Sequence, residues 1–534
     1  MTTSTEDLSA KAVARARRHT LGDIPARSAR RYPDRTALVD GEIRLTFAEL
    51  DVVIDRVAGA LSAAGLVAGD RLGLLSHNCW QFPVLTFATA RLGIVLVPVN
   101  FMLNPDEIAY ILGHSGCAAF VAEDVLVPTA QQAIRRSGRP VPVRGVIRRG
   151  GGAVPAAWAD VEQWCGYDGP PAPEVELSDD DPIRLMYTSG TESRPKGALL
   201  TSRSLMWQYS SSIVTGGMES SDVEIHSMPF YHCAQLDNFL ITDIYLGATS
   251  VVLGAPDPAE ILRAVEREGA TKLFCPPTVW IALLHSPELA DTDVHTLTKG
   301  YYGASAMPTE VLAEIRLRFP RLRLWNFYGQ TELAPLATAL PPEDQDEYAG
   351  SAGRPALNVE TRIVDPDGAE LGPDDVGEIV HRSPHLILGY HDDPERTREA
   401  FRDGWFHSGD LGYFDRTGRL WVVDRKKDMI KTGGENVSGR EVEEVLYAHD
   451  DVEEVAVFGV DHPRWIEAVV AAVVPRAGRT PDPDQLIRHC RERLTGYKTP
   501  KFVVLLDQLP KNPSGKILKR TLRTSYADLA QEGA

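Results

Sequence analysis

The feature that most constrains the fold of this chain is a polar, glycine-containing run that directly follows a short apolar strand. The strand ends in Leu185-Met186-Tyr187, and residues 188–197 then read TSGTESRPKG. Hydroxyl side chains, glycines and a lysine at the end of a strand are what a backbone needs to wrap polyphosphate oxygens. The run therefore predicts a nucleoside triphosphate site. The residues expected to contact the nucleotide are Thr188, Ser189, Gly190, Thr191 and Lys196.

This run is not a Walker A loop. That motif requires Ser or Thr directly after its lysine, whereas Gly197 follows Lys196 here. A polar stretch with glycine is, in isolation, more often an ordinary surface loop. The nucleotide assignment therefore depends on the other motifs in the chain.

Four further motifs follow the run in sequence. They are Tyr328-Gly329-Gln330-Thr331-Glu332, residues 404–410 (GWFHSGD), residues 424–431 (DRKKDMIK) and residues 512–516 (NPSGK). In this order the five motifs resemble those of the acyl-activating, adenylate-forming superfamily, which includes acyl-CoA synthetases, luciferases and the adenylation domains of peptide synthetases. The resemblance runs from about Ile24 to Arg523, nearly the whole chain. It implies an AMP-forming acid-thiol ligase that looks like a fatty-acid-CoA ligase.

Apolar, β-rich runs alternate with amphipathic stretches along most of the chain, a pattern typical of βα units and parallel sheets. Residues 272–275 read as a buried strand and residues 258–268 as a helix, for example, and Thr46 with Glu49 forms a capping box ahead of another helix. After Val423 the pattern restarts with shorter units. We therefore predict an α/β fold in two parts. Residues 1–424 form a large domain of parallel-rich sheets flanked by helices, residues 429–534 form a small, mobile α+β domain, and residues 143–181 form a surface linker within the large domain.

Length and composition agree with a large enzyme. A chain of 534 residues exceeds what one hydrophobic core usually serves, and 43% hydrophobic with 24% charged residues is ordinary globular composition. No apolar run approaches the ~18 residues of a spanning helix, and the polar N-terminus has no signal-peptide pattern. We therefore expect a cytoplasmic protein without a membrane span. The formal net charge of -18 argues against a nucleic-acid partner.

The resemblance implies roles for residues around the nucleotide. Glu332 and Thr188 are expected to bind Mg²⁺, a hard cation that prefers oxygen ligands. Lys516 is expected to enter the site from the small domain and to stabilise charge on the carboxylate and the α-phosphate. The other nucleotide contacts that the resemblance implies are Gly303, Ala304 and Ser305 along the adenine, Tyr328 stacked on it with Gly329 beside it, Thr331 at the α-phosphate, and Asp410 and Arg425 at the ribose.

The resemblance also implies a second half-reaction, in which the acyl group is transferred to coenzyme A, and a second set of residues that serves it. Residues 425–428 match the family's hinge, with Lys427 at the pivot, about which the small domain would rotate after adenylation. Rotation would bring Lys431 to the adenylate. Gly433 and Gly434, which lack Cβ atoms, would leave a tunnel for the pantetheine arm of coenzyme A.

Two further positions are expected to affect how the acceptor, coenzyme A, reaches the acyl-adenylate. His232, in the run Pro229-Phe230-Tyr231-His232, matches the family's gate between the carboxylate site and the acceptor tunnel, and a structural role for this histidine stays equally open. Ile466 stands where the family commonly has glycine, so the coenzyme A approach is expected to differ in shape there.

The residues next to the predicted gate indicate the chemical class of the acid substrate. Tyr231, Cys233 and Leu236 are uncharged, which suits an apolar acyl group. We therefore expect activation of a medium- or long-chain fatty acid through an acyl-adenylate, then thioester formation with coenzyme A. Aryl acids are the next class, and an acceptor other than coenzyme A, such as a carrier protein or an amine, stays open. The expected partners are thus ATP, Mg²⁺, coenzyme A and a small carboxylic acid, and a homodimer is the assembly to test.

Overall fold

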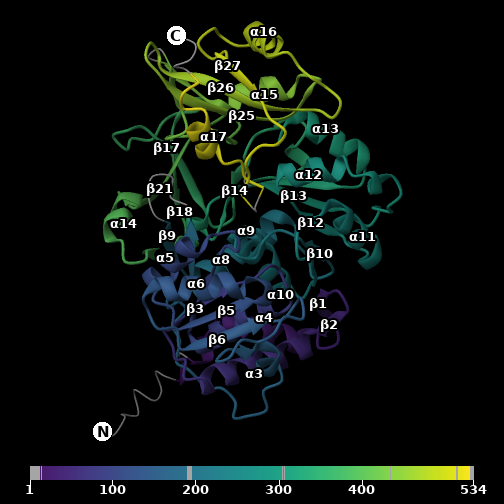
Figure 1. Ribbon diagram of the computed structural model, residues 1–534, viewed down its shortest axis with the longest axis vertical. Coiled ribbons are helices and arrows are strands. Elements are labelled where there is room, and N and C mark those ends of the chain that lie inside the picture. The colour runs from purple at the N-terminus through teal and green to yellow at the C-terminus, as the bar shows by residue number, and fades with distance from the viewer. Residues whose placement is uncertain are drawn as a thin grey trace.

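The computed structural model describes residues 12–13, 15–188, 195–303, 305, 307–432, 435–512 and 515–529. Six of the predicted site residues lie outside the described residues: Ser189, Gly190, Thr191, Ala304, Gly433 and Gly434. Figure 1 shows a large N-terminal domain with a smaller C-terminal domain, drawn in yellow-green and yellow, above it.

An eight-stranded sheet forms the lower half of the large domain. Its strands lie in the order β19-β9-β8-β4-β3-β5-β6-β7. Neighbouring strands from β8 to β7 are parallel, and β9 and β19 extend one edge in antiparallel pairing. The bounds are β3 Arg71–Leu75, β4 Val95–Pro98, β5 Ala119–Glu123, β6 Val143–Ile147, β7 Ala159–Asp160, β8 Pro182–Thr188, β9 Lys196–Thr201 and β19 Gly389–Tyr390.

A nine-stranded sheet forms the other half, in the order β16-β15-β14-β13-β12-β10-β11-β1-β2. Pairing is parallel from β14 to β1 and antiparallel at both edges. The bounds are β1 Thr36–Asp40, β2 Ile43–Thr46, β10 Val223–His226, β11 Thr249–Val252, β12 Lys272–Phe274, β13 Lys299–Gly303, β14 Arg323–Gly329, β15 Leu336–Leu340 and β16 Arg354–Pro355.

Two smaller sheets follow along the chain. The third sheet is antiparallel and belongs to the large domain. Its strands are β17 Glu360–Val364, β18 Gly377–Arg382, β20 Phe401–Arg402, β21 Trp405–Phe414 and β22 Leu420–Arg425. The fourth sheet forms the small domain, with strands β23 Ile430–Thr432, β24 Glu435–Val437, β25 Val452–His462, β26 Ile466–Pro475 and β27 Phe502–Leu505.

Helices flank the sheets of both domains (Figure 1). Those of the large domain are α2 Ile24–Arg31, α3 Phe47–Ala63, α4 Gln81–Leu92, α5 Pro105–Ser115, α6 Val127–Ser137, α7 Val161–Cys165, α8 Ser202–Gly216, α9 Cys233–Gln235, the π-helical turn η3 Leu236–Leu240, α10 Ile241–Leu246, α11 Pro258–Glu268, α12 Pro277–Leu284, α13 Thr309–Arg318 and α14 Pro394–Ala400. Those of the small domain are α15 Gly439–Tyr447, α16 Pro483–Arg493 and α17 Lys519–Ser525. The short 3₁₀ turns are η1 Leu21–Asp23, η2 Asp124–Leu126, η4 Pro287–Ala290, η5 Thr331–Leu333 and η6 Pro342–Asp344.

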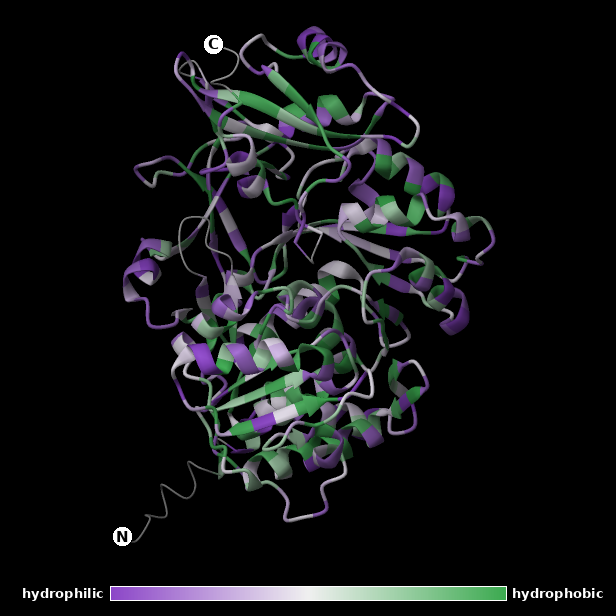
Figure 2. Ribbon diagram, viewed as in Figure 1, coloured by the Kyte–Doolittle hydropathy of each residue, from purple (hydrophilic) through white to green (hydrophobic). Residues whose placement is uncertain are grey.

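The central parallel strands are buried on both faces. Every residue of β4 and β5 is buried, as expected for parallel strands covered by helices, and Figure 2 shows the strand labelled β5 in Figure 1 as predominantly hydrophobic. The Thr46–Glu49 capping box forms as predicted, with the Glu49 backbone N–H donating to Thr46 Oγ1 at 3.2 Å. These features confirm the predicted α/β fold with a second, smaller domain. Among the described helices, none has both the length and the apolar content that crossing a bilayer requires.

The prediction of a surface linker over residues 143–181 is wrong in its first half. Residues 143–147 form β6, which pairs in parallel with β5, and residues 159–165 form β7 and α7. The glycines, prolines and acidic residues that indicated a loop are concentrated at 149–155 and 168–181. A five-residue strand between such segments has too few residues to show a clear period.

Ile466 adopts a backbone conformation that suits glycine. Its φ is +74° at the start of β26, and 64% of its surface is exposed. A β-branched residue is strained in this left-handed region because its Cβ crowds the backbone. Glycine, which the resemblance leads us to expect at this position, would avoid this strain.

Replacing Ile466 by Gly is expected to raise the free energy of unfolding of the small domain by about 1 kcal/mol. Relief of roughly 1–2 kcal/mol of left-handed strain exceeds the added flexibility that glycine gives the unfolded chain. Urea unfolding measures the change, and Ile466→Val, which keeps the β-branch, is the matched control. Equal stability of the Gly and Val variants would contradict the strain.

Candidate active site

A buried carboxylate, Glu332, lies where three segments of the large domain meet. Its Oε1 accepts hydrogen bonds from Lys196 Nζ at 2.7 Å and from the Tyr390 hydroxyl at 2.8 Å. Lys196 Nζ also donates to the Tyr390 hydroxyl at 2.6 Å. The three groups therefore form a closed triangle around a single carboxylate oxygen.

Strand pairing explains why Tyr390 joins this triangle. Tyr390 lies opposite Ala198 in the β19–β9 pair, and Lys196 is two residues before Ala198 on β9. Residues two apart on a strand share a face, so Tyr390 and Lys196 are diagonal neighbours. Sequence reasoning missed Tyr390, because nothing local indicates a two-residue strand that pairs with a segment so distant in the chain.

Opposing effects act on the Glu332 carboxylate. Burial raises its pKa, but the charge of Lys196 and the hydrogen bonds from Lys196 and Tyr390 outweigh burial, so that the net pKa lies below the usual value. Glu332 is therefore ionised at neutral pH. An ionised carboxylate is suited to bind a hard cation.

Thr188 supplies a second oxygen at this place. It ends β8 directly opposite Lys196 on β9. Its Oγ1 is buried and has no hydrogen-bond partner among the described residues. A buried hydroxyl without a partner and an ionised carboxylate are both hard oxygen donors, so this set fits Mg²⁺.

A second polar group lies around Asp410 on β21. Its Oδ2 accepts from the Tyr328 hydroxyl at 2.7 Å, and its Oδ1 lies 3.2 Å from Arg425 Nε. Asp410 and Arg425 are direct cross-strand partners in the β21–β22 pair, which sets this contact. Gln330 Nε2 adds a longer contact to Oδ2 at 3.4 Å. The predicted ribose residues and the predicted adenine residue thus form one connected group.

Two of the predicted site glycines allow close approach of neighbouring strands. A Cβ at Gly329 would lie 1.9 Å from the carbonyl oxygen of Pro335, and one at Gly303 would lie 2.3 Å from that of Phe327. Any side chain at these positions would therefore push apart the strands that carry Tyr328 and the other adenine-side residues. Ser305 is exposed.

Lys516 reaches this site from the small domain. Its loop contacts α12 of the large domain, where Thr278 Oγ1 donates to the carbonyl oxygen of Gly515 at 3.4 Å. Desolvation, followed by the positive charge of Arg425, lowers the pKa of Lys516 to about 8. The Lys516 side chain is exposed at the surface, yet it lies close enough to Arg425 for that positive charge to affect its pKa.

His232 lies close enough to Lys516 to be affected by its charge. It stands directly before α9, and its pKa is lowered to about 4 by desolvation and then by the charge of Lys516. The imidazole is therefore neutral at physiological pH. Its neighbour Cys233 has its Sγ 3.3 Å from Thr331 Oγ1, which links the predicted gate to the predicted α-phosphate contact.

Lys431 is not part of this cluster. It lies on β23 of the small domain with its side chain exposed, and its backbone N–H donates to a carboxylate oxygen of Glu467. In the described structure Lys516 lies next to the large-domain site, whereas Lys431 lies away from it. The role of Lys431 after domain rotation stays a prediction, as does the hinge at residues 425–428.

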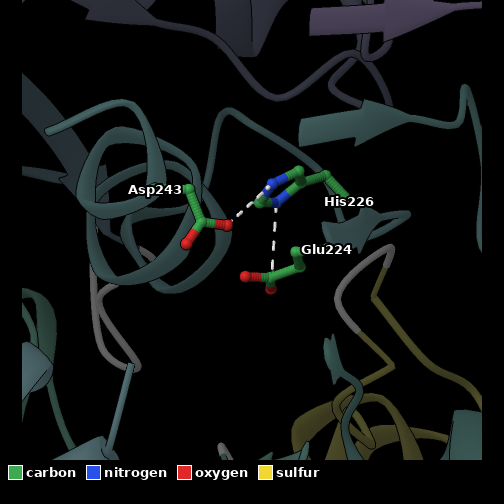
Figure 3. Close-up of side chains that lie close together, drawn as sticks. All are labelled: Glu224, His226 and Asp243. Atoms are coloured by element: carbon green, nitrogen blue, oxygen red, sulfur yellow. Dashed lines mark ion pairs between the residues drawn. The ribbon is translucent and has the colours of Figure 1, made fainter. Parts of the chain in front are cut away.

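A separate group of titratable side chains lies buried below the gate. Figure 3 shows Glu224 and His226 of β10 facing Asp243 of α10. His226 Nε2 is 3.3 Å from Asp243 Oδ2, and all three side chains are fully buried. Their ligand atoms are close enough together to hold a metal ion.

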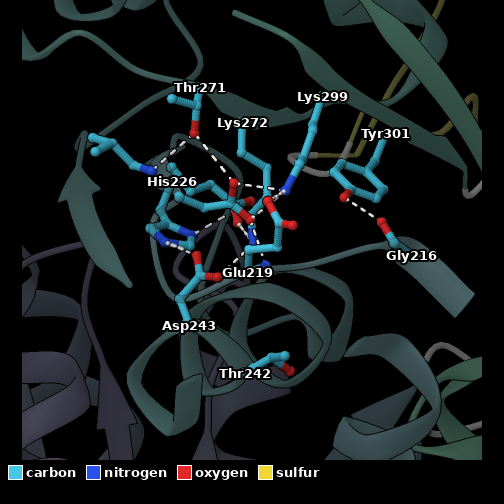
Figure 4. A network of polar contacts seen from close by, with 12 residues as sticks. Gly216, Glu219, His226, Thr242, Asp243, Thr271, Lys272, Lys299 and Tyr301 are labelled. Carbon is cyan, nitrogen blue, oxygen red and sulfur yellow. Dashed lines mark hydrogen bonds and ion pairs between the residues drawn. The ribbon is translucent and has the colours of Figure 1, made fainter. Parts of the chain in front are cut away.

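Lys272 of β12 already supplies the cation for this group. Its Nζ lies 2.7 Å from Glu224 Oε2 and forms a second ion pair with Asp243, as Figure 4 shows for the surrounding network. The network continues to the gate segment, because His226 Nδ1 contacts Gln235 Nε2 at 2.8 Å, and Gln235 Oε1 accepts from the Met228 backbone N–H at 3.2 Å. We therefore interpret this group as structural support and not as a metal site.

Comparison with known proteins identifies the family. Residues 25–391 match the AMP-binding enzyme family, and residues 441–516 match the AMP-binding enzyme C-terminal domain. The chain belongs to the AMP-binding enzyme family. The predicted resemblance is thereby confirmed.

Three relatives illustrate the match. The feruloyl-CoA synthase of Amycolatopsis sp is 37% identical over 95% of this chain and 99% of its own length. The long-chain-fatty-acid–CoA ligase FadD13 of Mycobacterium tuberculosis H37Rv is 32% identical over 91% of this chain and 94% of its own. The crystal structure of the anthranilate CoA ligase AuaEII with anthranoyl-AMP is similar with a TM-score of 0.88, at 25% identity, over 96% of this chain and 98% of that one.

The enzyme is accordingly an AMP-forming acid–CoA ligase that uses ATP, Mg²⁺ and coenzyme A. Glu332 and Thr188 are the residues that fit Mg²⁺, which supplies charge neutralisation on the phosphates when bound. The contact of Asp410 with the ribose hydroxyls and the role of Lys516 in adenylation stay predictions.

Replacing Tyr390 by Phe is expected to raise the KM for ATP·Mg²⁺ about tenfold, because Glu332 loses one of its two hydrogen-bond donors and shifts relative to Lys196. The rate of pyrophosphate release at varied Mg²⁺ concentration measures the effect. Glu332→Gln is the reference, with a loss of about 100-fold or more in kcat. An unchanged Mg²⁺ dependence in the Tyr390 variant would contradict a positioning role for its hydroxyl.

The pKa of about 8 for Lys516 predicts a pH dependence of adenylation. The ammonium form is present below that pKa and is lost as the pH rises through it, so kcat/KM for ATP, which reports the free enzyme, is expected to fall above pH ~8. In Lys516→Arg the fall should disappear up to pH ~10, since guanidinium stays charged there, even if the rate itself is lower. Parallel profiles for the two proteins would contradict the assignment.

Proposed function

We propose that the ligase activates an aryl carboxylic acid as an acyl-adenylate and transfers the acyl group to coenzyme A. The observation that carries the adenylation step is the convergence of Glu332, Asp410 and Lys516, which come from three separate segments of the chain. The class of acid is supported by the 37% identity with a feruloyl-CoA synthase. The likeness to an anthranilate CoA ligase adds to this support.

In the first half-reaction the acid's carboxylate attacks the α-phosphorus of ATP, and pyrophosphate leaves. Little covalent work falls to the protein, so its contribution is alignment and charge stabilisation. Asp410 and Arg425 hold the ribose, Thr331 lies near the α-phosphate, and Lys516 bridges carboxylate and phosphate oxygens. His232 stays neutral and separates this site from the acceptor side.

In the second half-reaction the small domain rotates about residues 425–428, and Lys516 leaves the site. Lys431 and the segment that follows it then face the adenylate. The thiol sulfur of coenzyme A attacks the acyl carbon, the bond from that carbon to the phosphate oxygen breaks, and AMP leaves. Exposure of the Lys431 side chain in the present arrangement is compatible with such a second position.

The fatty-acid substrate expected from the sequence stays a prediction. It has support from the similarity to FadD13, and a direct comparison of acids decides between the two classes. An acceptor other than coenzyme A is tested in the same experiment.

The purified enzyme is incubated with ATP and Mg²⁺ and with single acids from two panels, hydroxycinnamic, cinnamic, benzoic and arylacetic acids in one and C6 to C18 fatty acids in the other. Each reaction is run with and without coenzyme A. Pyrophosphate, AMP and thioester are quantified, and Lys516→Ala, with adenylation slowed by about 100-fold or more, is the control. We expect kcat/KM for the best aryl acid to exceed that for the best fatty acid by at least about tenfold.

The outcomes separate the parts of the proposal. Thioester formed faster from a fatty acid would overturn the aryl assignment and restore the fatty-acid prediction. Pyrophosphate release without thioester would keep adenylation and move the search to another acceptor. No pyrophosphate with any acid would contradict adenylation of these acid classes.

A further inference from the structure

The start of α15 in the small domain is hydrogen-bonded to the end of β22 in the large domain. The segment between the two contains the predicted hinge, residues 425–428. Three consecutive residues on one side of it donate to three consecutive residues on the other: Ser438 Oγ to the carbonyl oxygen of Val423 at 2.9 Å, the Gly439 backbone N–H to Asp424 Oδ2 at 3.0 Å, and Arg440 Nη1 to the carbonyl oxygen of Val422 at 2.6 Å.

Arg440 also contacts a second segment of the large domain. Its Nη2 donates to the carbonyl oxygen of Gly350 at 2.9 Å. Gly350 lies in the loop between η6 and β16, well before β22 in the chain. The side chain of Arg440 is partly buried, and its planar guanidinium carries two donors in a fixed geometry. One side chain therefore ties α15 to two separate parts of the large domain.

Other polar contacts between the two domains are longer. A hydrogen bond from a charged donor at short distance is stronger than one between neutral groups or one near the distance limit. Three such longer contacts are those of Thr309 Oγ1 with Glu444 Oε1 at 3.1 Å, of Thr278 Oγ1 with the carbonyl oxygen of Gly515 at 3.4 Å, and of His285 Nδ1 with Glu453 Oε1 at 3.9 Å. Arg440 thus makes the shortest side-chain contacts of this group.

The bonds of Arg440 belong to the present orientation of the small domain. Residues 422–424 precede the predicted hinge and residues 438–440 follow it, so a rotation about residues 425–428 moves donors and acceptors apart. In the present orientation Lys516 lies next to the large-domain site. A contact that exists in only one of two arrangements stabilises that arrangement by its own free energy.

We propose that Arg440 is a positioning residue for adenylation. By binding the carbonyl oxygens of Val422 and Gly350, it holds the small domain in the orientation that presents Lys516, and both bonds break before the second half-reaction. Arg440 acts through Lys516 and not on the reacting atoms. This inference rests on the proposed two-step function and on rotation about residues 425–428.

The test measures the two half-reactions separately with the full-length enzyme. The acid is the one with the highest kcat/KM in the two panels described above. Adenylation is followed as pyrophosphate release in a single turnover with ATP and Mg²⁺ but without coenzyme A. Thioester formation is followed from the chemically synthesised acyl-adenylate of the same acid and coenzyme A.

The variant is Arg440→Met, which keeps an unbranched side chain but removes the N–H donors. Adenylation is expected to slow by roughly five- to tenfold, because the orientation that presents Lys516 becomes less populated. Thioester formation from the acyl-adenylate is expected to keep or exceed the wild-type rate. A residue that only supports the fold would slow both half-reactions by the same factor.

Arg493→Met is the matched control. Arg493 also donates to a backbone carbonyl oxygen, that of His489 at 3.1 Å, but both residues belong to α16 within the small domain. Its replacement removes the same charge from the same domain and is expected to leave both rates unchanged. The ratio of the two rates in one preparation is insensitive to partial loss of folded enzyme.

Hydrogen exchange of the substrate-free protein gives a readout that needs no acid. The loop that carries Lys516 contacts α12 through Gly515, so release of the small domain exposes it. We expect the amides of this loop to exchange at least about threefold faster in Arg440→Met than in the wild type, with β25 and β26 unchanged. Arg493→Met should exchange like the wild type.

The outcomes separate this inference from the function on which it rests. Equal slowing of both half-reactions in Arg440→Met, or wild-type rates in both, would overturn the role of Arg440 and leave the two-step function in place. If the wild-type enzyme forms no adenylate from any acid, the proposed function fails. Hydrogen exchange then decides alone, because unchanged exchange of the Lys516 loop in Arg440→Met would show that Arg440 does not hold the small domain.

Discussion

The contact between Glu332 and Lys196 is the interaction on which the large-domain part of the site depends. It joins the turn after β14 in the nine-stranded sheet to the start of β9 in the eight-stranded sheet. The Glu332 carboxylate is buried, whereas the Lys196 side chain is 28% exposed, and a buried charge is tolerable only when it is paired and hydrogen-bonded. The pair therefore links the two sheets at the place where we predict that the nucleotide binds.

Much of the fold and part of the site could be predicted from the sequence. The helix at 258–268 has the predicted bounds, since Asp257, Pro258 and a following glycine mark its two ends. Motif residues such as Glu332 could be assigned because each motif is local in the sequence. Tyr390 could not be assigned, because its role follows only from the pairing of two distant strands.

The errors have the same physical origin. The sequence predicts a linker at β6 because a five-residue strand flanked by glycine and proline has too weak a hydrophobic pattern to indicate a strand. Its parallel pairing with β5 joins segments that are distant in the sequence, and no local pattern reveals such a pairing. The cross-strand contact of Asp410 with Arg425 is also a product of tertiary pairing. Ile466 is the opposite case, because the sequence already shows isoleucine where the resemblance leads us to expect glycine, and the structure has a strained backbone there.

The hairpin of β21 and β22 has a mechanical consequence. Arg425 is the last residue of β22 and the strand partner of Asp410, and the chain passes from there into the small domain within five residues. A reorientation of the small domain would therefore act directly on Arg425, which pairs with Asp410, the residue predicted to bind the ribose. If the small domain turns about residues 425–428 as predicted, nucleotide binding and domain orientation are expected to affect each other through this one pair of strand residues.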